Sequence, residues 1–213
     1  MNNNNIGRKL LVFAILMIMI LSSTGCSKKD STDEKETKYL SPSYVIDMNN
    51  PEEVVGLSSN VFVGYVEKMK DTYYISDIPY TRYDVKVINN IKGELVLDKT
   101  IQVNKEGGIS KDSSCYILME DDVLPVENEY YVFNVRERVE DGSYTASGIN
   151  TAVLLNDSDL KNTSDKGGTD ISGKDNVSQE SNMAKIKVRL ETSDIYQKYQ
   201  EAFEHQVLYD PNK

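Results

Sequence analysis

Seven short apolar runs between residues 61 and 155 constrain the fold of this chain more than any other feature. They are rich in valine, isoleucine and tyrosine, which favour extended backbone. Apolar and polar residues alternate over residues 83–87, so Tyr83, Val85 and Val87 should face inward. Gly64 interrupts the first run and predicts a bulge or a sharp bend. Short strands at this spacing predict a mainly β domain, either a small barrel or a sandwich. The runs cover residues 61–66, 83–87, 100–104, 115–119, 130–135, 144–146 and 151–155, with a hairpin turn at 140–143.

Two helices are predicted to flank these strands. Asn50 can cap a short helix that begins at Pro51, because proline suits the first helical position. Residues 192–194 should open a second helix, whose apolar stripe either packs on its own domain or binds a partner. Alternation before that helix predicts one more strand. The apolar residues of the strand are Ala184, Ile186, Val188 and Leu190, and those of the helix are Ile195, Tyr199, Ala202, Phe203 and Val207.

Two polar stretches divide the chain. Residues 27–38 contain no apolar residue and cannot bury enough surface to offset the entropy of ordering, so they should be flexible. A later stretch is rich in serine, asparagine, aspartate and glycine, which is typical of a disordered loop or linker. The predicted organisation is an N-terminal segment 1–25, a tether 26–40, a β-barrel domain 41–155, a linker 156–182, and a strand plus helix, 183–213, that packs on the barrel.

The N-terminal segment has the layout of an export signal. Arg8 and Lys9 precede an apolar run over residues 10–21, which is too short to span a bilayer as a helix. Small residues follow, ending at Cys26. This arrangement resembles the lipobox signal peptide of bacterial lipoproteins, although Ser23 stands where that family usually has leucine.

The lipoprotein resemblance implies both a location and an anchor. In that family the cysteine receives a diacylglyceryl group and becomes the first residue after cleavage. Cys26 would therefore anchor the mature chain to the cell membrane on its extracytoplasmic side. Two or three acyl chains would hold the protein stably, whereas one chain is marginal. An ordinary secreted protein cut near Gly25 and an uncleaved membrane anchor are the alternatives.

Three sequence segments carry a second resemblance. They are residues 60–66, residues 83–87 with 91–93, and residues 127–133. Their order resembles that of small exported bacterial proteins with an OB-like, netrin- or TIMP-like β-barrel. The resemblance implies such a barrel over residues 51–155, with a short N-terminal helix and a C-terminal helix. Protease inhibition does not carry over, because Cys26 would be acylated and the cysteines that brace the inhibitors are missing.

The formal net charge of −10 at pH 7 limits the partners. Nucleic acid is a poor match, because its binding rests on cationic contacts with phosphate. Anionic lipid would repel the domain, so attachment to the membrane must come from Cys26 rather than from charge. Cys115 is the other cysteine, which leaves no disulfide framework within the domain. We expect a monomer.

Residues that could carry catalysis or hold a metal are few. His205 is the single histidine, so a histidine-rich zinc site is excluded, and no cofactor motif is present. A Cys115–His205 nucleophile pair is conceivable, but a cysteine within a strand is more typical of a small buried apolar residue. The acids at 120–122, with Glu127 and Glu129, either bind Ca²⁺ or form a solvated loop. We expect neither an enzyme nor a bound metal.

Three tyrosines between the first two predicted strands are the candidate ligand-binding residues. Tyr73, Tyr74 and Tyr80 lie in a segment that contributes to the binding face of OB-like barrels. They could stack on a sugar or hold a peptide, or they could belong to extended strands and pack on the barrel. The prediction is a non-catalytic binding module for an envelope or extracellular protein or glycan. The alternatives are a thiol-dependent or hydrolytic enzyme using Cys115, and a purely structural or immunity-type envelope protein.

Overall fold

The computed structural model describes residues 35–155, 186 and 188–212, and it confirms a mainly β protein. The signal segment, Cys26 and the linker 156–182 lie outside the described residues. None of the described helices is long and apolar enough to cross a membrane. The strands are β1 (Thr37–Leu40), β2 (Asn60–Ile75), β3 (Ile78–Lys92), β4 (Thr100–Glu106), β5 (Gly108–Ile109), β6 (Tyr116–Met119), β7 (Tyr130–Glu137), β8 (Tyr144–Ala146) and β9 (Ala152–Leu154).

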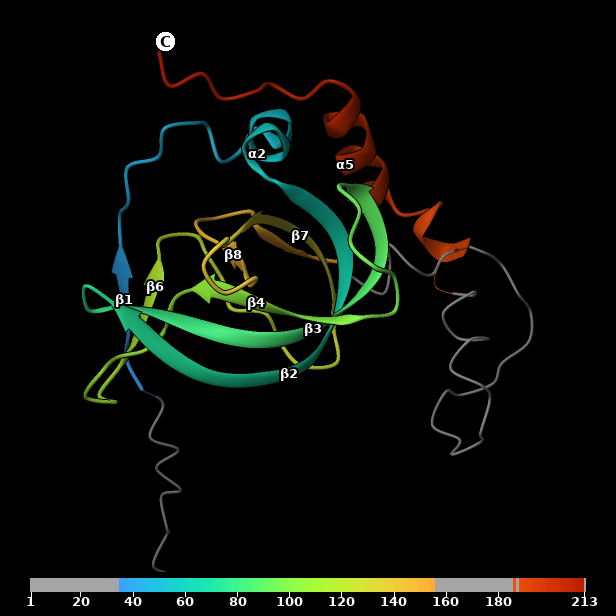
Figure 1. The fold of residues 1–213 in the computed structure, drawn as a ribbon. Helices are drawn as coiled ribbons and strands as arrows, with labels where there is room; N and C mark the ends of the chain where they lie inside the picture. Colours follow the sequence, from blue (N-terminus) through green and yellow to red (C-terminus); the bar gives the residue numbers. More distant parts are fainter. Residues whose placement is uncertain (1–34, 156–185, 187, 213) are drawn as a thin grey trace, which may run out of the picture. The chain divides into compact units, whose positions relative to one another are not determined.

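Five strands of the larger sheet pair in a ring (Figure 1). The pairs β2–β3, β3–β4, β8–β7 and β7–β2 are antiparallel, whereas β4–β8 is parallel. Following these pairs from β2 therefore leads back to β2. The sixth strand, β9, adds to β7 in antiparallel orientation. The predicted hairpin turn at 140–143 is confirmed, since it joins β7 to β8.

Strands β2 and β3, which contain the first two predicted runs, are much longer than the sequence predicted. They form a ribbon that extends beyond the ring and closes in a two-residue turn at Ser76 and Asp77. Both turn residues have positive φ, 49° and 68°, as tight hairpin turns require. The expected bulge at Gly64 is confirmed by a register shift between Val63 and Gly64. A Cβ at Gly64 would lie 2.5 Å from Val85, so the close strand contact needs glycine there.

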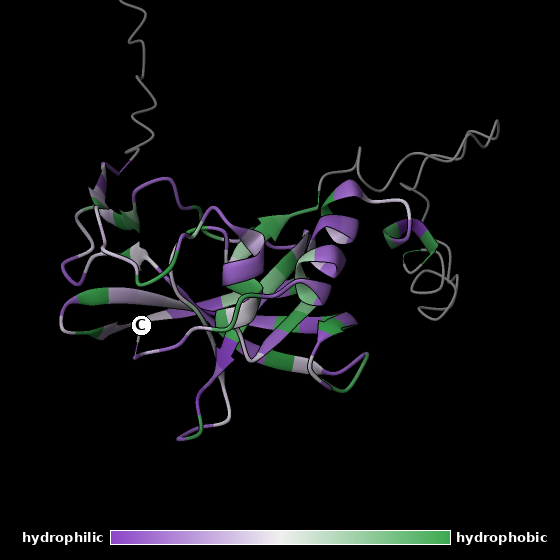
Figure 2. Cartoon of the chain, turned by 90° about the horizontal axis from the view of Figure 1, so that it is seen from above, coloured by the Kyte–Doolittle hydropathy of each residue, from purple (hydrophilic) through white to green (hydrophobic). Residues whose placement is uncertain are grey.

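Alternate residues of β2 enter two different cores. Phe62 belongs to a cluster within the ring, where its aromatic ring stacks on Phe133 at 5.4 Å between centroids. Val61 and Val63 point the other way, into a cluster beneath the helices. Burial on both faces explains why this run is continuously apolar. Hydrophobic residues are frequent in the central strands, whereas hydrophilic residues predominate in the peripheral loops (Figure 2).

Two helices cover the second cluster, and both begin where the sequence predicted. The helix α2 (Pro51–Leu57) is capped by Asn50, whose side chain accepts a hydrogen bond from the N–H of Glu52. The helix α5 (Asp194–Glu204) is capped by Ser193. Tyr196, Tyr199 and Ala202 of α5 are buried in the cluster together with residues of α2, β2 and β7. Its apolar stripe therefore packs on its own domain.

The strand predicted before α5 is wrong for the described residues. Ile186 and residues 188–190 are helical. A helix turns Ile186 and Leu190 to the same side, where both contact the second cluster. Val188, which a strand would place beside them, is 66% exposed. Apolar spacing over so few residues fits both the strand period and the helical period. The helical period is the one that places Ile186 and Leu190 together against the second cluster.

The end of the predicted tether is also ordered. Thr37–Leu40 form β1, which pairs in parallel with β6 in a three-stranded sheet of order β1-β6-β5. Most of β1 is exposed, and Tyr39 is 61% exposed. Backbone pairing rather than side-chain burial therefore holds this segment, which explains why hydrophobicity alone did not predict it.

Candidate functional site

The structure brings together two of the three candidate tyrosines. Tyr73 of β2 and Tyr80 of β3 are direct cross-strand partners, so their side chains share one face of the ribbon. Their rings stack at 5.5 Å with an interplanar angle of 25°. Tyr74 alternates to the opposite face. The sequence left open whether these residues lie in a loop or in strands, and the structure places all three in strands.

Two arginines complete this cluster. The guanidinium carbon of Arg82 lies 4.5 Å from the centroid of the Tyr73 ring, close enough for a cation–π contact. Arg138, which follows β7, donates a hydrogen bond from Nη1 to the Tyr73 hydroxyl at 3.3 Å. We call Tyr73, Tyr80, Arg82 and Arg138 the tyrosine–arginine face. It joins the ribbon to the turn between β7 and β8.

The sequence analysis identified the tyrosines but missed both arginines. Arg82 follows Tyr80 by two residues in β3, so strand periodicity could have placed it on the same face. Arg138 is 65 residues from Tyr73 along the chain. Its position depends on the pairing of β7 with β2, which no local pattern shows.

The turn that carries Arg138 is tightly built. The N–H of Arg138 donates to the Ser143 carbonyl at 2.8 Å, and the N–H of Gly142 donates to the Arg138 carbonyl at 2.9 Å. Asp141 accepts from the N–H and the hydroxyl of Ser143, and these bonds lower the pKa of its carboxyl group. Gly142 supplies the positive φ, 68°, that the turn needs. The arginine is thus presented by a fixed backbone.

Carboxylates lie close to the arginines. Arg82 donates to Asp71 at 2.8 Å, and the guanidinium of Arg138 lies 3.9 Å from Asp141. The two arginine side chains remain 35% and 33% exposed, so these ion pairs are weak and leave donors available. The face therefore offers hydrogen-bond donors and acceptors side by side rather than a strongly cationic patch.

Tyr80 is held as a neutral hydrogen-bond donor. Its hydroxyl donates to Glu106 at 3.3 Å. Burial, reinforced by the negative charge of Glu106, raises the pKa of Tyr80 to about 12. The phenol therefore stays protonated at physiological pH and can donate to a ligand or to Glu106.

Tyr74 has a different environment on the opposite face of the ribbon. Its hydroxyl donates to the Ile109 carbonyl of β5 at 3.1 Å. The ammonium of Lys111 lies 5.9 Å from the centroid of its ring. These contacts fasten the ribbon to the three-stranded sheet, which is a structural role.

The conceivable thiol site is not assembled. Cys115 is 3% exposed, and its N–H donates to the hydroxyl of Ser110 just before β6. His205 is exposed at the C-terminal end of α5, where its ring lies 2.9 Å from the Glu201 carbonyl. Cys115 precedes β6 of the three-stranded sheet, whereas His205 follows α5, which covers the second cluster, so the two residues belong to separate parts of the fold.

Two of the acids at 120–122, Glu120 and Asp122, have separate structural partners. Asp122 forms a buried ion pair with Lys105, and Glu120 accepts from the hydroxyl of Ser41. Glu127 accepts from the backbone N–H of Met69. Among residues 35–155, 186 and 188–212, no three histidine, cysteine, aspartate or glutamate side chains converge as a metal site would require.

No protein-family model matches the chain, and no curated protein matches its sequence.

Proposed function

We propose that this protein is a lipid-anchored, extracytoplasmic binding module without catalytic activity. The ligand would be an envelope or extracellular glycan or protein, held by the tyrosine–arginine face. The observation that carries the proposal is the convergence of Tyr73, Arg82 and Arg138 from two distant segments. Preorganised aromatic and arginine side chains are the groups that dominate recognition surfaces.

The proposed fold is an OB-like barrel of the netrin- or TIMP-like kind. An OB-fold is a five-stranded, partly open barrel that binds ligands on its second and third strands and on two loops, the first–second and the fourth–fifth. The ring of β2, β3, β4, β7 and β8 supports this proposal. In that correspondence the Ser76–Asp77 turn is the first loop, and the turn carrying Arg138 is the other. The tyrosine–arginine face lies between the two.

The chemistry of the face suits a polar ligand without a large charge. Tyr73 and Tyr80 provide aromatic surface. The two arginines provide hydrogen-bond donors, and the carboxylates of Asp71 and Asp141 provide acceptors. Glycan hydroxyl groups both donate and accept, so this mixture complements them. A protein partner would use the same aromatic and arginine side chains as anchors.

The proposed anchor is Cys26. Ten residues, 27–36, separate it from β1, and such a segment reaches at most about 35 Å when fully extended. The intact mass of the membrane-extracted protein tests this anchor. A chain that starts at Cys26 and carries diacylglycerol is expected, and Cys26→Ala should lose the modification. An unmodified soluble wild-type product would contradict the anchor.

Binding is tested with the membrane-extracted protein on two supports, isolated envelope glycan and immobilised envelope proteins. The double variant Arg82→Gln/Arg138→Gln should lose most of the captured protein on one support. Tyr74→Phe is the matched control, because it alters the same ribbon on its other face. The support that captures wild type identifies the ligand class. Equal capture of wild type and double variant would contradict the proposed face.

A further inference from the structure

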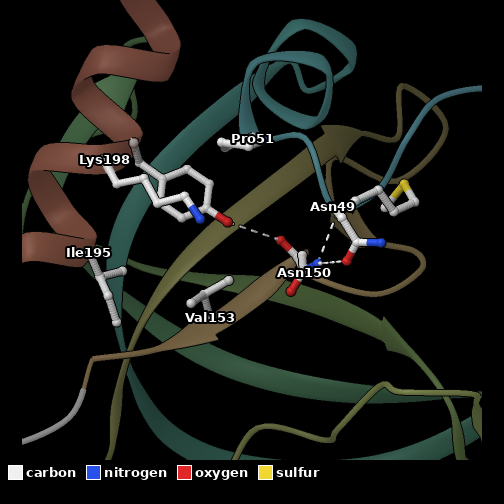
Figure 3. Close-up of a pocket in the computed structure, with 8 residues that line it drawn as sticks. Asn49, Pro51, Asn150, Val153, Ile195 and Lys198 are labelled. Carbon is white, nitrogen blue, oxygen red and sulfur yellow. Dashed lines mark hydrogen bonds between the residues drawn. The ribbon is translucent and has the colours of Figure 1, made fainter.

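A pocket of about 290 Å³ lies between the start of α2, strand β9 and helix α5 (Figure 3). Ligand pockets of proteins span roughly 300–1,000 Å³, so this one could hold only a small molecule or a single terminal residue. It lies away from the tyrosine–arginine face, and none of its lining residues belongs to that face.

Three elements supply apolar walls. Pro51 comes from the first turn of α2, Val153 from β9 and Ile195 from the first turn of α5 (Figure 3). Val153 and Ile195 also pack against the second core cluster, which holds them in place. One side of the pocket is therefore a fixed apolar surface.

Among the described residues that line the pocket, Lys198 alone is charged, although the chain as a whole carries a net charge of −10. Within the described residues, Lys198 forms no ion pair. Figure 3 shows its side chain reaching from α5 into the space that faces Asn150. Glu53, in the first turn of α2, already accepts hydrogen bonds from the backbone N–H of Asp47 at 3.0 Å and from the side-chain amide of Asn50 at 3.2 Å. A cation thus faces the pocket, and none of the carboxylates that the structure describes forms an ion pair with it.

Tyr199 adds a second donor beside this cation. Its hydroxyl donates to the Asn150 carbonyl at 3.5 Å, the long limit of a hydrogen bond. Burial raises the pKa of Tyr199 to about 12, so the hydroxyl stays protonated and remains a hydrogen-bond donor. The loop opposite is fixed, because the Asn150 amide donates to the Met48 carbonyl at 3.0 Å and to Asn49 at 3.3 Å.

We propose that this pocket binds a small carboxylic acid. The carboxylate would lie between the Lys198 ammonium and the Tyr199 hydroxyl, and the apolar part would contact Pro51, Val153 and Ile195. Charge-assisted hydrogen bonds of this kind are the strong ones in ligand recognition. The same chemistry is offered by a free short-chain acid and by the C-terminal residue of a peptide. The inference does not depend on the tyrosine–arginine face.

The test is a titration of the full-length protein, followed by NMR, with two probes and two controls. Hexanoate represents a free acid, and N-acetylvaline represents a peptide C-terminus. Hexanamide and hexylamine keep the apolar part but lack the carboxylate. We expect saturable shifts at residues of the pocket with at least one acid, and none with the amide or the amine. The acid that binds identifies the source of the ligand.

Three variants locate the contact. Lys198→Gln should weaken binding at least tenfold, because the ammonium is the main partner of the carboxylate. Tyr199→Phe should weaken it several-fold. Lys111 lies between β5 and β6, outside the pocket, so the control variant Lys111→Gln should bind the acid as wild type does. The proposal is overturned if neither acid binds saturably, if hexanamide binds as well as the tighter-binding acid, or if Lys198→Gln binds that acid with unchanged affinity.

Discussion

The base and the tip of the β2–β3 ribbon belong to the same two strands but differ in almost every property. At the base, Phe62 and Val85 are fully buried, and β2 contributes to both cores. At the tip, Tyr73 and Tyr80 are half-buried, and charged side chains flank them. The register shifts between Met69 and Thr72, which separates the two parts. Buried apolar packing is therefore concentrated at the base, whereas the tip carries the partly exposed aromatic and arginine side chains of the proposed binding face.

The largest effect on stability should come from the base. Phe62→Ala removes a fully buried ring that stacks on Phe133, and such truncations cost about 3–5 kcal/mol of unfolding free energy. Denaturant unfolding of wild type and variant measures the loss. A loss below about 1 kcal/mol would show that neighbouring side chains fill the cavity, and it would contradict tight packing at the base.

A comparable loss is expected where β4 supports the ribbon. Lys105 pairs in register with Thr81 of β3, and its buried ammonium is neutralised by Asp122. Asp122→Asn leaves that ammonium without its counter-charge, which should cost about 3–5 kcal/mol. Unfolding measurements on Asp122→Asn and on exposed Asp121→Asn, as the control, provide the comparison. Equal stability of the two variants would mean that the ion pair does not hold β4 in place.

A smaller loss is expected at the tip. Tyr73→Ala removes the stack with Tyr80 and the contact with Arg82, each worth about 0.5–1.5 kcal/mol. The variant should remain folded and lose about 1–3 kcal/mol, compared with about 3–5 kcal/mol for Phe62→Ala. Circular dichroism and denaturant unfolding on both variants measure the difference. A Tyr73→Ala loss as large as that of Phe62→Ala would remove the distinction between base and tip.

The smallest effect is the response of the tip to alkaline pH. Burial and Glu106 raise the pKa of Tyr80 to about 12, above the value near 10 of an unfolded tyrosine. The folded state therefore holds this proton more tightly. Its contribution to stability is complete below about pH 10 and is lost as the pH rises towards 12. Tyr80→Phe should lose less stability than wild type between about pH 10 and pH 12. Parallel pH profiles would contradict the assigned environment of Tyr80.

Local patterns in the sequence predicted several elements. The capping residue Asn50, the bulge at Gly64 and the hairpin before β8 each depend on neighbouring residues, and the structure contains all three. The tip was missed because residues 67–72 are mainly polar, whereas cross-strand pairing rather than burial makes them extended. Ile186 and residues 188–190 were misassigned because their apolar spacing fits two periods.

The candidate site could be predicted only in part. Aromatic side chains around a turn identified Tyr73 and Tyr80, but the register that stacks them depends on the tight turn at Ser76 and Asp77. The contact between Arg138 and Tyr73 requires the ring of strands to bring β7 beside β2. Contacts that depend on such distant pairing are a property of the whole fold and leave no signal in a single sequence.

Hydrogen–deuterium exchange, with and without the envelope material that captures the protein, tests the division between base and tip most directly. We expect slower exchange in residues 70–82 and 138–144, which contain the tyrosine–arginine face, and unchanged exchange in residues 60–66 at the base. Protection confined to residues 108–119, on the side of Tyr74, would contradict binding at the tip. An unchanged exchange rate at the tip would contradict it as well.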